Sequence, residues 1–318
     1  MSNYLFGKKI AVPGGGGFVG SYLVPELQKR GAMVFVPRTE HGWDLSREAD
    51  VRKLYTYGPF DMVINLAAFQ GGIAFHRGRQ ADMYFRNTLM STYLMQFAQE
   101  AGVKKYINLV AGCSYPGVAT EVLEEKGYWD GEVHDSIFSY GFPRKASVVQ
   151  GKALFKQHGF NSIHLLIANL YGPGEHMNPD QSKALAGMLR RFYEAKRFGI
   201  PKVEVWGSGE PIRDWLYVKD AVRLILLACE KYDSIEPLNI ASGVGVTVRD
   251  LAMIIKRLVG YEGEVIFDSS KPDGAMKKVF SVKRMKEVIG EPNVTPLEDG
   301  ILETLAWFEA NYEMAKDR

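Results

Sequence analysis

Residues 12–20 read VPGGGGFVG, and this stretch decides the fold. A short apolar run, Lys9–Val12, enters it, and a helical pattern, Ser21–Arg30, leaves it. The spacing GxxGxxG lets the chain turn at its first glycine, brings a pyrophosphate close to the backbone at its second, and packs helix against strand at its third. The helix N-terminus then faces the phosphates. The stretch predicts a dinucleotide-binding turn that contributes Gly14, Gly17, Phe18, Val19 and Gly20.

Short β-branched runs alternate with helical patterns over the first half of the chain. This alternation is typical of a doubly wound parallel sheet, so we predict an α/β fold with a Rossmann-type sheet and a smaller C-terminal α/β substrate domain. We place the dinucleotide-binding domain at 1–170, with contributions from about 205–240, and the nucleotide-sugar domain mainly at 171–318. The predicted strands of the sheet are Lys9–Val12, Met33–Pro37, Met62–Asn65, Lys105–Val110 and Ser162–Ile167.

The longest helical patterns are Gln80–Glu100 and Tyr140–His158. We expect both to be amphipathic and to offer an outer face to a partner helix, which predicts a homodimer. The second half has a looser rhythm with many Gly and Pro turns. Its clearest elements are a strand, Val203–Trp206, and two helices, Val218–Lys231 and Pro296–Tyr312.

Composition excludes several classes of protein. The chain has 318 residues and a net charge of +2, so we expect no nucleic-acid partner. We find neither an apolar run near 18 residues nor a signal-peptide pattern, which predicts a cytoplasmic protein without a membrane partner. The two cysteines, Cys113 and Cys229, lie far apart in the sequence, and we expect both to be reduced and no metal to be bound.

The end of the second predicted strand indicates which dinucleotide is preferred. An NAD-preferring site usually places an acid there, but the sequence reads VFVPRT at 34–39. Arg38 can pair with a 2′-phosphate, which favours NADP over NAD, although a solvated loop arginine is the alternative. Asp44 and Leu45 follow at the spacing of an adenine contact. The third predicted strand ends in small or apolar residues beside the cofactor, namely Leu66, Ala67 and Ala68.

Further motifs extend over nearly the whole chain. They read NLAAFQGGI (65–73), CSYP (113–116), NLYGPGEHMNP (169–179), VWGSGEPIRDWLYVKD (205–220) and DSSKPDGAMKK (268–278). With the glycine turn they resemble the extended short-chain dehydrogenase/reductases and, among them, the GDP-L-fucose synthase family. The resemblance implies hydride transfer with NADP or NAD on a nucleotide-linked sugar, most simply a GDP-linked hexose. It also implies Asn87 at the cofactor, and substrate contacts from Gly71, Gly72, Asn169, Arg191, Trp206, Arg213 and Lys278.

The same resemblance implies an altered proton-transfer site. Tyr140 matches the family's general acid, but Arg144 stands where the family has a lysine, and the nearest lysine is Lys145. Ala111 stands where the family has a serine or threonine. A one-residue slip would turn each side chain to another face, so we keep the ungapped alignment. Arg144 still favours the phenolate form of Tyr140 and can bind the nicotinamide ribose. Loss of the hydroxyl removes a donor, which elsewhere is worth about 3 kcal/mol in the transition state.

Cys113 stands where the resemblance implies a base for C3/C5 epimerisation. The family's partner histidine is replaced by Lys183. An ammonium group lowers a thiol pKa and can return a proton to a carbanion, so this pair is chemically sensible. A structural cysteine with a solvated lysine is the alternative, and His176 in the nearby loop is a second candidate acid.

Three functions remain open from the sequence. The first is an NAD(P)-dependent oxidoreductase or epimerase that acts on a GDP-sugar, with 4-keto reduction and C3/C5 epimerisation. The second is an NAD-dependent sugar-nucleotide epimerase or C4 dehydrogenase that keeps and recycles its cofactor. The third is a nucleotide-sugar or dinucleotide binding protein without catalysis.

Overall fold

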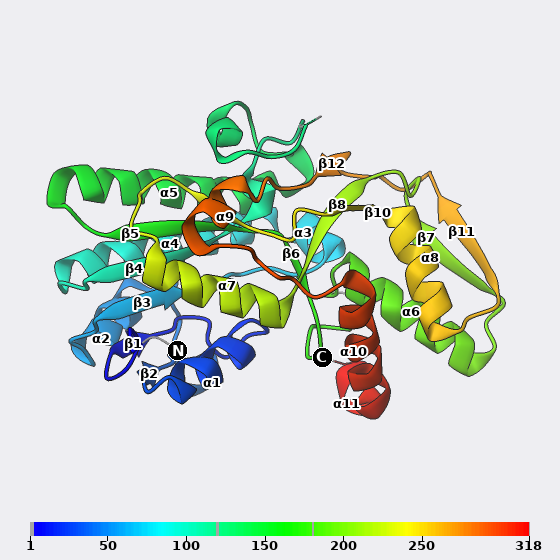
Figure 1. The fold of residues 1–318 in the computed structure, drawn as a ribbon, viewed down its shortest axis with the longest axis horizontal. Helices are drawn as coiled ribbons and strands as arrows, with labels where there is room; N and C mark the ends of the chain where they lie inside the picture. The colour runs from blue at the N-terminus through cyan, green and yellow to red at the C-terminus, as the bar shows by residue number, and fades with distance from the viewer. Residues whose placement is uncertain (1–2, 119–120, 180, 318) are drawn as a thin grey trace.

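The computed structural model describes residues 3–118, 121–179 and 181–317, and it has a larger and a smaller part (Figure 1). The larger part contains a six-stranded sheet in the order β2-β1-β3-β4-β5-β9, and every pairing in it is parallel. The smaller part is built on mixed pairing around β8. The predicted α/β fold with a Rossmann-like sheet and a smaller C-terminal part is confirmed.

The strand order reverses at β1, because β2 lies on one side of it and β3 on the other. Crevices at such a reversal, beyond the carboxyl ends of the strands, are where open parallel sheets bind ligands. The glycine stretch directly follows β1 and therefore lies in this crevice. The six strands are β1 (Lys9–Ala11), β2 (Met33–Phe35), β3 (Met62–Asn65), β4 (Lys105–Ala111), β5 (Ser162–Ile167) and β9 (Leu238–Ile240).

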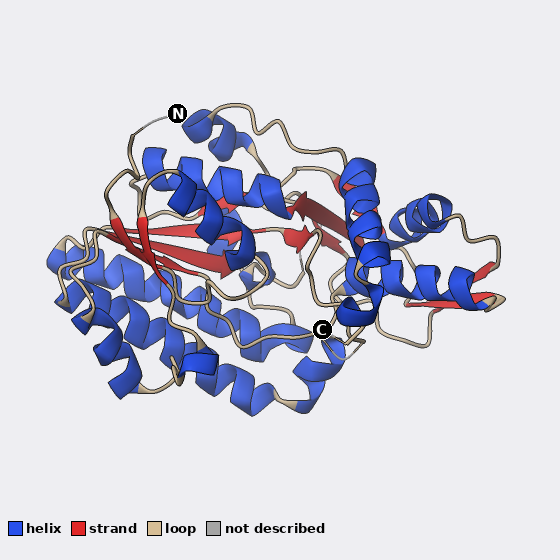
Figure 2. Cartoon of the chain, turned by 90° about the horizontal axis from the view of Figure 1, so that it is seen from below, coloured by secondary structure: helices blue, strands red, loops and turns tan. Residues whose placement is uncertain are grey.

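Helices cover both faces of the sheet (Figure 2). Strand side chains alternate between faces, so Ile10 belongs to one apolar cluster and Ala11 to the other. The cluster of Ile10 includes residues of α1 and α7, and that of Ala11 includes residues of α2, α4 and α5. These helices are α1 (Gly20–Lys29), α2 (Glu48–Thr56), α4 (Gln80–Glu100), α5 (Phe138–His158) and α7 (Val218–Lys231), with α9 (Lys283–Ile289) packed on α7.

The smaller part centres on β8 (Ile212–Tyr217), which pairs with β6, β10 and β12. A separate parallel pair joins β7 to β11, and helices α6, α8 and α10 pack beside these strands. The strands are β6 (Asn169–Tyr171), β7 (Lys202–Trp206), β10 (Gly245–Thr247), β11 (Glu264–Asp268) and β12 (Lys277–Lys278). The helices are α6 (Ala184–Phe198), α8 (Val248–Val259), α10 (Leu297–Ala310) and α11 (Tyr312–Ala315).

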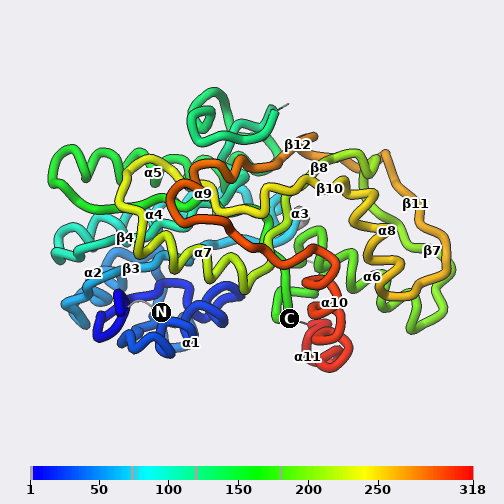
Figure 3. Tube along the Cα trace, in the orientation of Figure 1, coloured from blue at the N-terminus to red at the C-terminus, as the bar shows by residue number. Residues whose placement is uncertain are grey.

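The segment between β4 and α5, described at residues 112–118 and 121–137 and called the excursion below, extends from the sheet to the smaller part. In Figure 3 it stands above the sheet beside β12, and a bridge between Leu123 and Phe280 fixes it there. It carries three 3-10 turns, η2 (Gly112–Ser114), η3 (Glu125–Trp129) and η4 (Asp135–Ile137). The remaining short elements are η1 (Thr39–His41) and α3 (Ile73–Gly78).

The helices differ from the sequence pattern in two respects. The pattern over 296–312 divides at Asn311 into α10 and α11. The two longest helices are also less one-sided than expected, because Phe85 on α4 is 61% exposed and Val149 on α5 is 53% exposed. Within the described ranges, no helix combines the length and apolarity that crossing a membrane requires.

Candidate active site

The glycine turn has the shape that a pyrophosphate requires. Gly14 has φ +79°, and a Cβ added there would lie 2.6 Å from the backbone nitrogen of Ala67 at the end of β3. A Cβ on Gly20 would collide with the carbonyl of Gly15, and one on Gly17 would lie 3.3 Å from the oxygen of Gly14. Side chains are therefore excluded from the turn, and α1 begins directly after it. The residues present fit a bound dinucleotide at this place.

Arg38 lies against the glycine turn. Its Nη1 atom is 3.4 Å from the place where a Cβ on Gly16 would be, and it donates to Glu40 (3.1 Å). No acidic residue stands directly after β2, which ends at Phe35. Glu40, five residues later, pairs its carboxylate with the guanidinium of Arg38. Arg38 is thus placed to meet a 2′-phosphate, and Glu40 competes for it.

The other residues predicted at the cofactor make contacts with neighbouring parts of the protein. Asp44 accepts from the backbone and hydroxyl of Ser46 and pairs with Arg86 at 3.7 Å. Phe18 packs edge-on against Tyr22, and Val19 is the N-cap residue of α1. Leu45, Leu66, Ala67 and Ala68 lie on the loops that follow β2 and β3, and Leu45 packs against the apolar cluster under α2.

Asn87 is fully buried, and its amide is occupied by the protein. It exchanges hydrogen bonds with the backbone of Phe69, donates to the carbonyl of Met83, and accepts from Arg144 (2.9 Å). Arg144 also donates to the carbonyl of Ala67 (2.9 Å). Asn87 therefore acts on the site through the loop after β3, which it fixes in position.

Tyr140 and Arg144 lie side by side at the start of α5. The guanidinium carbon is 5.4 Å from the centre of the Tyr140 ring, and both side chains are buried. Burial raises the pKa of Tyr140, and the charge of Arg144 opposes that rise. Lys145 points elsewhere, because its Nζ donates to Gly131 (2.8 Å) over the ring of Tyr128. In the structure, Arg144 and not Lys145 is therefore the cation beside Tyr140.

Cys113 lies on the turn that follows β4, close to Tyr140. A Cβ on Gly141 would be 3.1 Å from the Cys113 carbonyl, so the start of α5 packs directly on this turn. The thiol is partly buried, and burial raises its pKa above the usual range. Lys278 is the cation that opposes this rise most, with smaller effects from Arg144 and Lys183.

The two lysines near Cys113 differ in their surroundings. Lys278 on β12 is only 7% exposed, and burial lowers its pKa. Lys183 is more open and pairs with Glu175 at 3.4 Å. Glu175 is 3% exposed, and burial raises the pKa of its carboxyl. The sequence prediction paired Cys113 with Lys183, whereas in the structure Lys278 has the stronger electrostatic effect on the thiol.

The predicted substrate residues lie on several different elements. Arg213 and Lys278 are register partners on neighbouring strands β8 and β12, and burial lowers the pKa of both. Arg191 on α6 donates to the carbonyl of Glu204 (2.7 Å), and Trp206 at the end of β7 is 50% exposed. Asn169 on β6 donates to the carbonyl of Asp214 (3.0 Å). Gly71 and Gly72 lie at the entry to α3, where a Cβ on Gly71 would press on the ring of Phe75.

Asp214 joins the segments that carry these cations. It is fully buried on β8 and accepts from the backbone and hydroxyl of Ser242 (3.1 and 2.7 Å), from Gly243 (3.0 Å) and from the amide of Phe280 (3.4 Å). Burial raises its pKa. One carboxylate thus ties β8 to the loop after β9 and to the chain just after β12.

Sequence reasoning missed two residues of the site. Gln70 accepts a hydrogen bond from the hydroxyl of Tyr140 (3.1 Å). The pKa of His134, on the excursion, is lowered by burial and by the charges of Lys278 and Arg213, while Asp135 opposes this. Gln70 lies inside the NLAAFQGGI stretch, but the motif does not show that its amide meets Tyr140, and His134 lies in a segment without a recognised motif.

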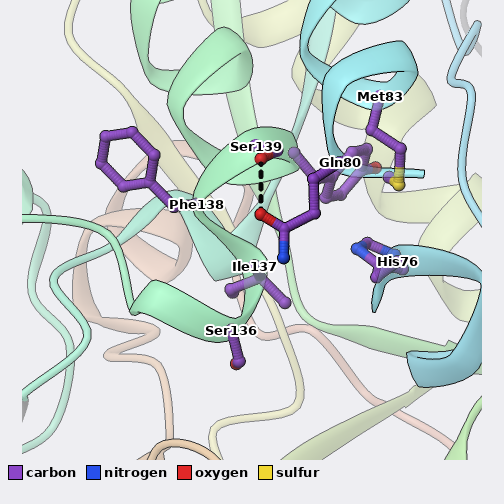
Figure 4. Close-up of a pocket in the computed structure, with 8 residues that line it drawn as sticks. His76, Gln80, Met83, Ser136, Ile137, Phe138 and Ser139 are labelled. Atoms are coloured by element: carbon purple, nitrogen blue, oxygen red, sulfur yellow. Dashed lines mark hydrogen bonds between the residues drawn. The ribbon is translucent and has the colours of Figure 1, made fainter. Parts of the chain in front are cut away.

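A small pocket lies where α3, α4, η4 and α5 meet, and Tyr140 is one of the residues that line it (Figure 4). The ring of His76 meets the Tyr140 ring edge-on at 5.5 Å. Gln80 at the start of α4 accepts from Ser139 at the start of α5 (3.4 Å), so the two helices are linked at this pocket.

Comparison with known proteins shows the family to which this fold belongs. Residues 10–241 match the NAD dependent epimerase/dehydratase family, and the chain belongs to that family. It is 35% identical over 303 residues to GDP-L-fucose synthase 1 of Arabidopsis thaliana, a match that covers 95% of this chain and 94% of the relative. It is 33% identical over 311 residues to probable GDP-L-fucose synthase 1 of Oryza sativa subsp. japonica, with 98% and 94% covered.

The solved structures include a relative with its cofactor. The crystal structure of a GDP-L-fucose synthetase from Naegleria fowleri bound to NADP resembles this chain with a TM-score of 0.86 and 26% sequence identity. The match covers 98% of this chain and 97% of that one.

Proposed function

We propose that this protein reduces a 4-keto sugar linked to GDP and uses NADPH as its reductant. The observation that carries the proposal is the placement of Tyr140. Tyr140 lies beside Arg144 at the start of α5, which packs on the turn that carries Cys113. A neutral phenol next to a fixed cation is a general acid that can release its proton and be stabilised afterwards.

NADPH, when bound, supplies the hydride. The glycine turn and the N-terminus of α1 would hold its pyrophosphate, and Arg38 would meet its 2′-phosphate. NADP in the Naegleria fowleri structure supports this preference over NAD. Arg144 and the loop fixed by Asn87 would orient the nicotinamide half against Tyr140.

The substrate side is suited to a diphosphate. Burial lowers the pKa of Lys278, Arg213 and Arg191, which means that their charged forms are destabilised by desolvation. An anion bound close to these side chains would offset that destabilisation. The exposed ring of Trp206 offers a surface for a base. The GDP link is supported by relatives named GDP-L-fucose synthase at 33 to 35% identity.

We infer that Cys113 removes protons next to the ketone, at C3 or C5. A thiolate that forms beside Lys278 is a suitable base, and Lys183 or Lys278 can return a proton. Exchange needs only the base, whereas inversion needs a donor on the opposite face of the ring. Exchange without inversion is therefore one outcome that the site allows.

The test combines both steps in one reaction. Purified protein is mixed with GDP-4-keto-6-deoxymannose and NADPH in deuterated water, and cofactor oxidation and deuterium at C3 and C5 are measured. The proposal requires NADPH oxidation that depends on the sugar. It is wrong if a sugar that demonstrably binds causes none.

Cys113→Ser separates the two steps. We expect this variant to keep cofactor binding and fold and to lose the label at C3 and C5, because hydride transfer alone leaves those carbons unlabelled. If wild-type protein places no deuterium in several 4-keto GDP-sugars that it binds, Cys113 is structural.

We also infer that two copies associate through α4 and α5. These helices pack on each other and expose Phe85 and Val149, which are better placed in a helix interface than in water. Sedimentation equilibrium tests this, and a monomer at micromolar concentration would contradict it.

A further inference from the structure

A ketone that accepts a hydride needs hydrogen-bond donors on its oxygen, and Tyr140 is one of them. We propose that Gln70 is the second donor to this oxygen, through its amide nitrogen. This inference rests on the proposed reduction and adds a catalytic residue to it.

The position of Gln70 supports this role. Its Oε1 accepts from the Tyr140 hydroxyl at 3.1 Å. Tyr140 is 7% exposed whereas Gln70 is exposed, so the glutamine covers the open side of the phenol, from which a substrate must approach. The loop is held directly before Gln70 by the bonds between Asn87 and Phe69.

Other side chains near Tyr140 are already committed. Ala111 has no donor, and the hydroxyl of Ser114 donates to the carbonyl of Ala111 (2.7 Å). The Nη2 atom of Arg144 serves both Ala67 and Asn87. The Nε atom of Arg144 is the exception, because it is buried without a partner among the described residues. The amide nitrogen of Gln70 also has no hydrogen-bond partner among those residues, and because Gln70 is exposed its amide is free to turn towards a ligand.

The reaction then balances with simple steps. The carbonyl carbon receives a hydride, and the carbonyl oxygen receives the proton of the Tyr140 hydroxyl. Tyr140 becomes a phenolate beside Arg144. The substrate oxygen replaces Oε1 of Gln70 as the acceptor of Tyr140, and the Gln70 amide turns so that its nitrogen donates to the same oxygen. Gln70 itself neither gains nor loses a proton.

The test uses Gln70→Leu, with Gln80→Leu as the matched control. Gln80 lines the same pocket as Tyr140 but bonds to Ser139. With NADPH and GDP-4-keto-6-deoxymannose, we expect Gln70→Leu to lower kcat about 100-fold with little change in KM, as for other donors to a developing oxyanion. Gln80→Leu should stay within about threefold of wild type, since its contact is exposed.

Rescue gives the sharper result. Ala111→Ser places a hydroxyl at the end of β4, and in the Gln70→Leu background we expect it to restore kcat at least tenfold. A Gln70→Leu protein with wild-type kcat overturns the inference and leaves the proposed reduction intact. Absence of turnover by the wild-type protein overturns the reduction, and the inference with it.

A measurement without cofactor or substrate checks the contact itself. Tyrosine labelled with 13C at Cζ reports the ionisation of Tyr140, and Tyr140→Phe identifies its signal. We expect Gln70→Leu to lower the pKa of Tyr140, because the neutral phenol loses its acceptor. An unchanged pKa in Gln70→Leu overturns the inference.

Discussion

The predicted cofactor side and the proposed substrate side of the site are built from different kinds of groups. On the cofactor side, the glycine turn acts through its backbone and through the absence of side chains, and its parts lie within nine residues, 12–20. On the proposed substrate side, the candidate groups are cations on separate strands, Arg213 on β8 and the buried Lys278 on β12, which lie 100 and 165 residues after Cys113 in the chain.

The difference teaches where single substitutions should matter. A backbone site tolerates changes in nearby side chains, because no one of them makes the main contact. A site made of buried charged groups depends on each of them, because removing one charge leaves the remaining buried charges without compensation. Tyr140 stands where the two sides meet and should be the most sensitive position.

Tyr140→Phe should have the largest effect. It removes the proton donor but no phosphate contact, so we expect kcat to fall about 10²- to 10⁴-fold while NADPH binding changes only a few-fold. Steady-state kinetics and calorimetry with NADPH measure the two quantities. Unchanged turnover would move the general acid to another residue.

Lys278→Met should come second. A charge-assisted hydrogen bond is worth about 1.5–3 kcal/mol, so we expect GDP to bind roughly 10- to 100-fold more weakly. NADPH affinity should not change. Lys277→Met is the matched control, because neighbouring residues of a strand point to opposite faces. An equal loss of GDP affinity in Lys278→Met and Lys277→Met would show that the substrate side does not depend on Lys278 in particular.

The pH dependence of Cys113 should come third. Burial raises the pKa of the thiol above its usual value of about 8.5, so the thiol form predominates at neutral pH. Because the base is the thiolate, exchange at C3 or C5 should rise about tenfold per pH unit until the pH reaches the raised pKa. Hydride transfer needs protonated Tyr140, whose pKa is also raised, and should stay flat from pH 6 to about 9. An exchange rate that does not change with pH would exclude Cys113 as the base.

Arg38→Ala should have the smallest effect. The guanidinium is exposed and shared with Glu40, so we expect the preference for NADPH over NADH to fall about tenfold, at the low end for a charged contact. Glu40→Gln should instead raise NADPH affinity, since it frees Arg38. Calorimetry with both cofactors checks this. If Arg38→Ala also abolishes NADH binding, the cofactor side depends on side chains after all.

The sequence predicts the fold well, and it locates the glycine turn, because these signals are local. Glycine spacing and strand and helix periods lie within short windows, and helix Gln80–Glu100 has the predicted bounds. The substrate side depends on contacts between distant segments. Nothing in the sequence around Gln70 predicts that its amide meets Tyr140, seventy residues later, because that contact depends on how the loop after β3 lies against α5.

The electrostatic partner of Cys113 shows the same limit. Alignment along the chain favours Lys183, but the fold pairs that lysine with Glu175 and brings the buried Lys278 towards the thiol. The order of effects depends on burial and on how β12 lies beside β8. Neither can be known before the two parts of the chain are packed together.

The hydrogen bonds of Asp214 have a consequence for the order in which the protein matures on the ribosome. When residues up to 240 have emerged, all strands of the six-stranded sheet are present, but the amides of Ser242, Gly243 and Phe280 that solvate this carboxylate are not. A buried carboxylate without donors is unfavourable, so β8 has no reason to settle before these residues arrive. The bonds from Ser242 and Gly243 can form soon after β9 is made, whereas the bond from Phe280, and with it the pairing of β12 beside β8, must wait until about forty further residues have been synthesised.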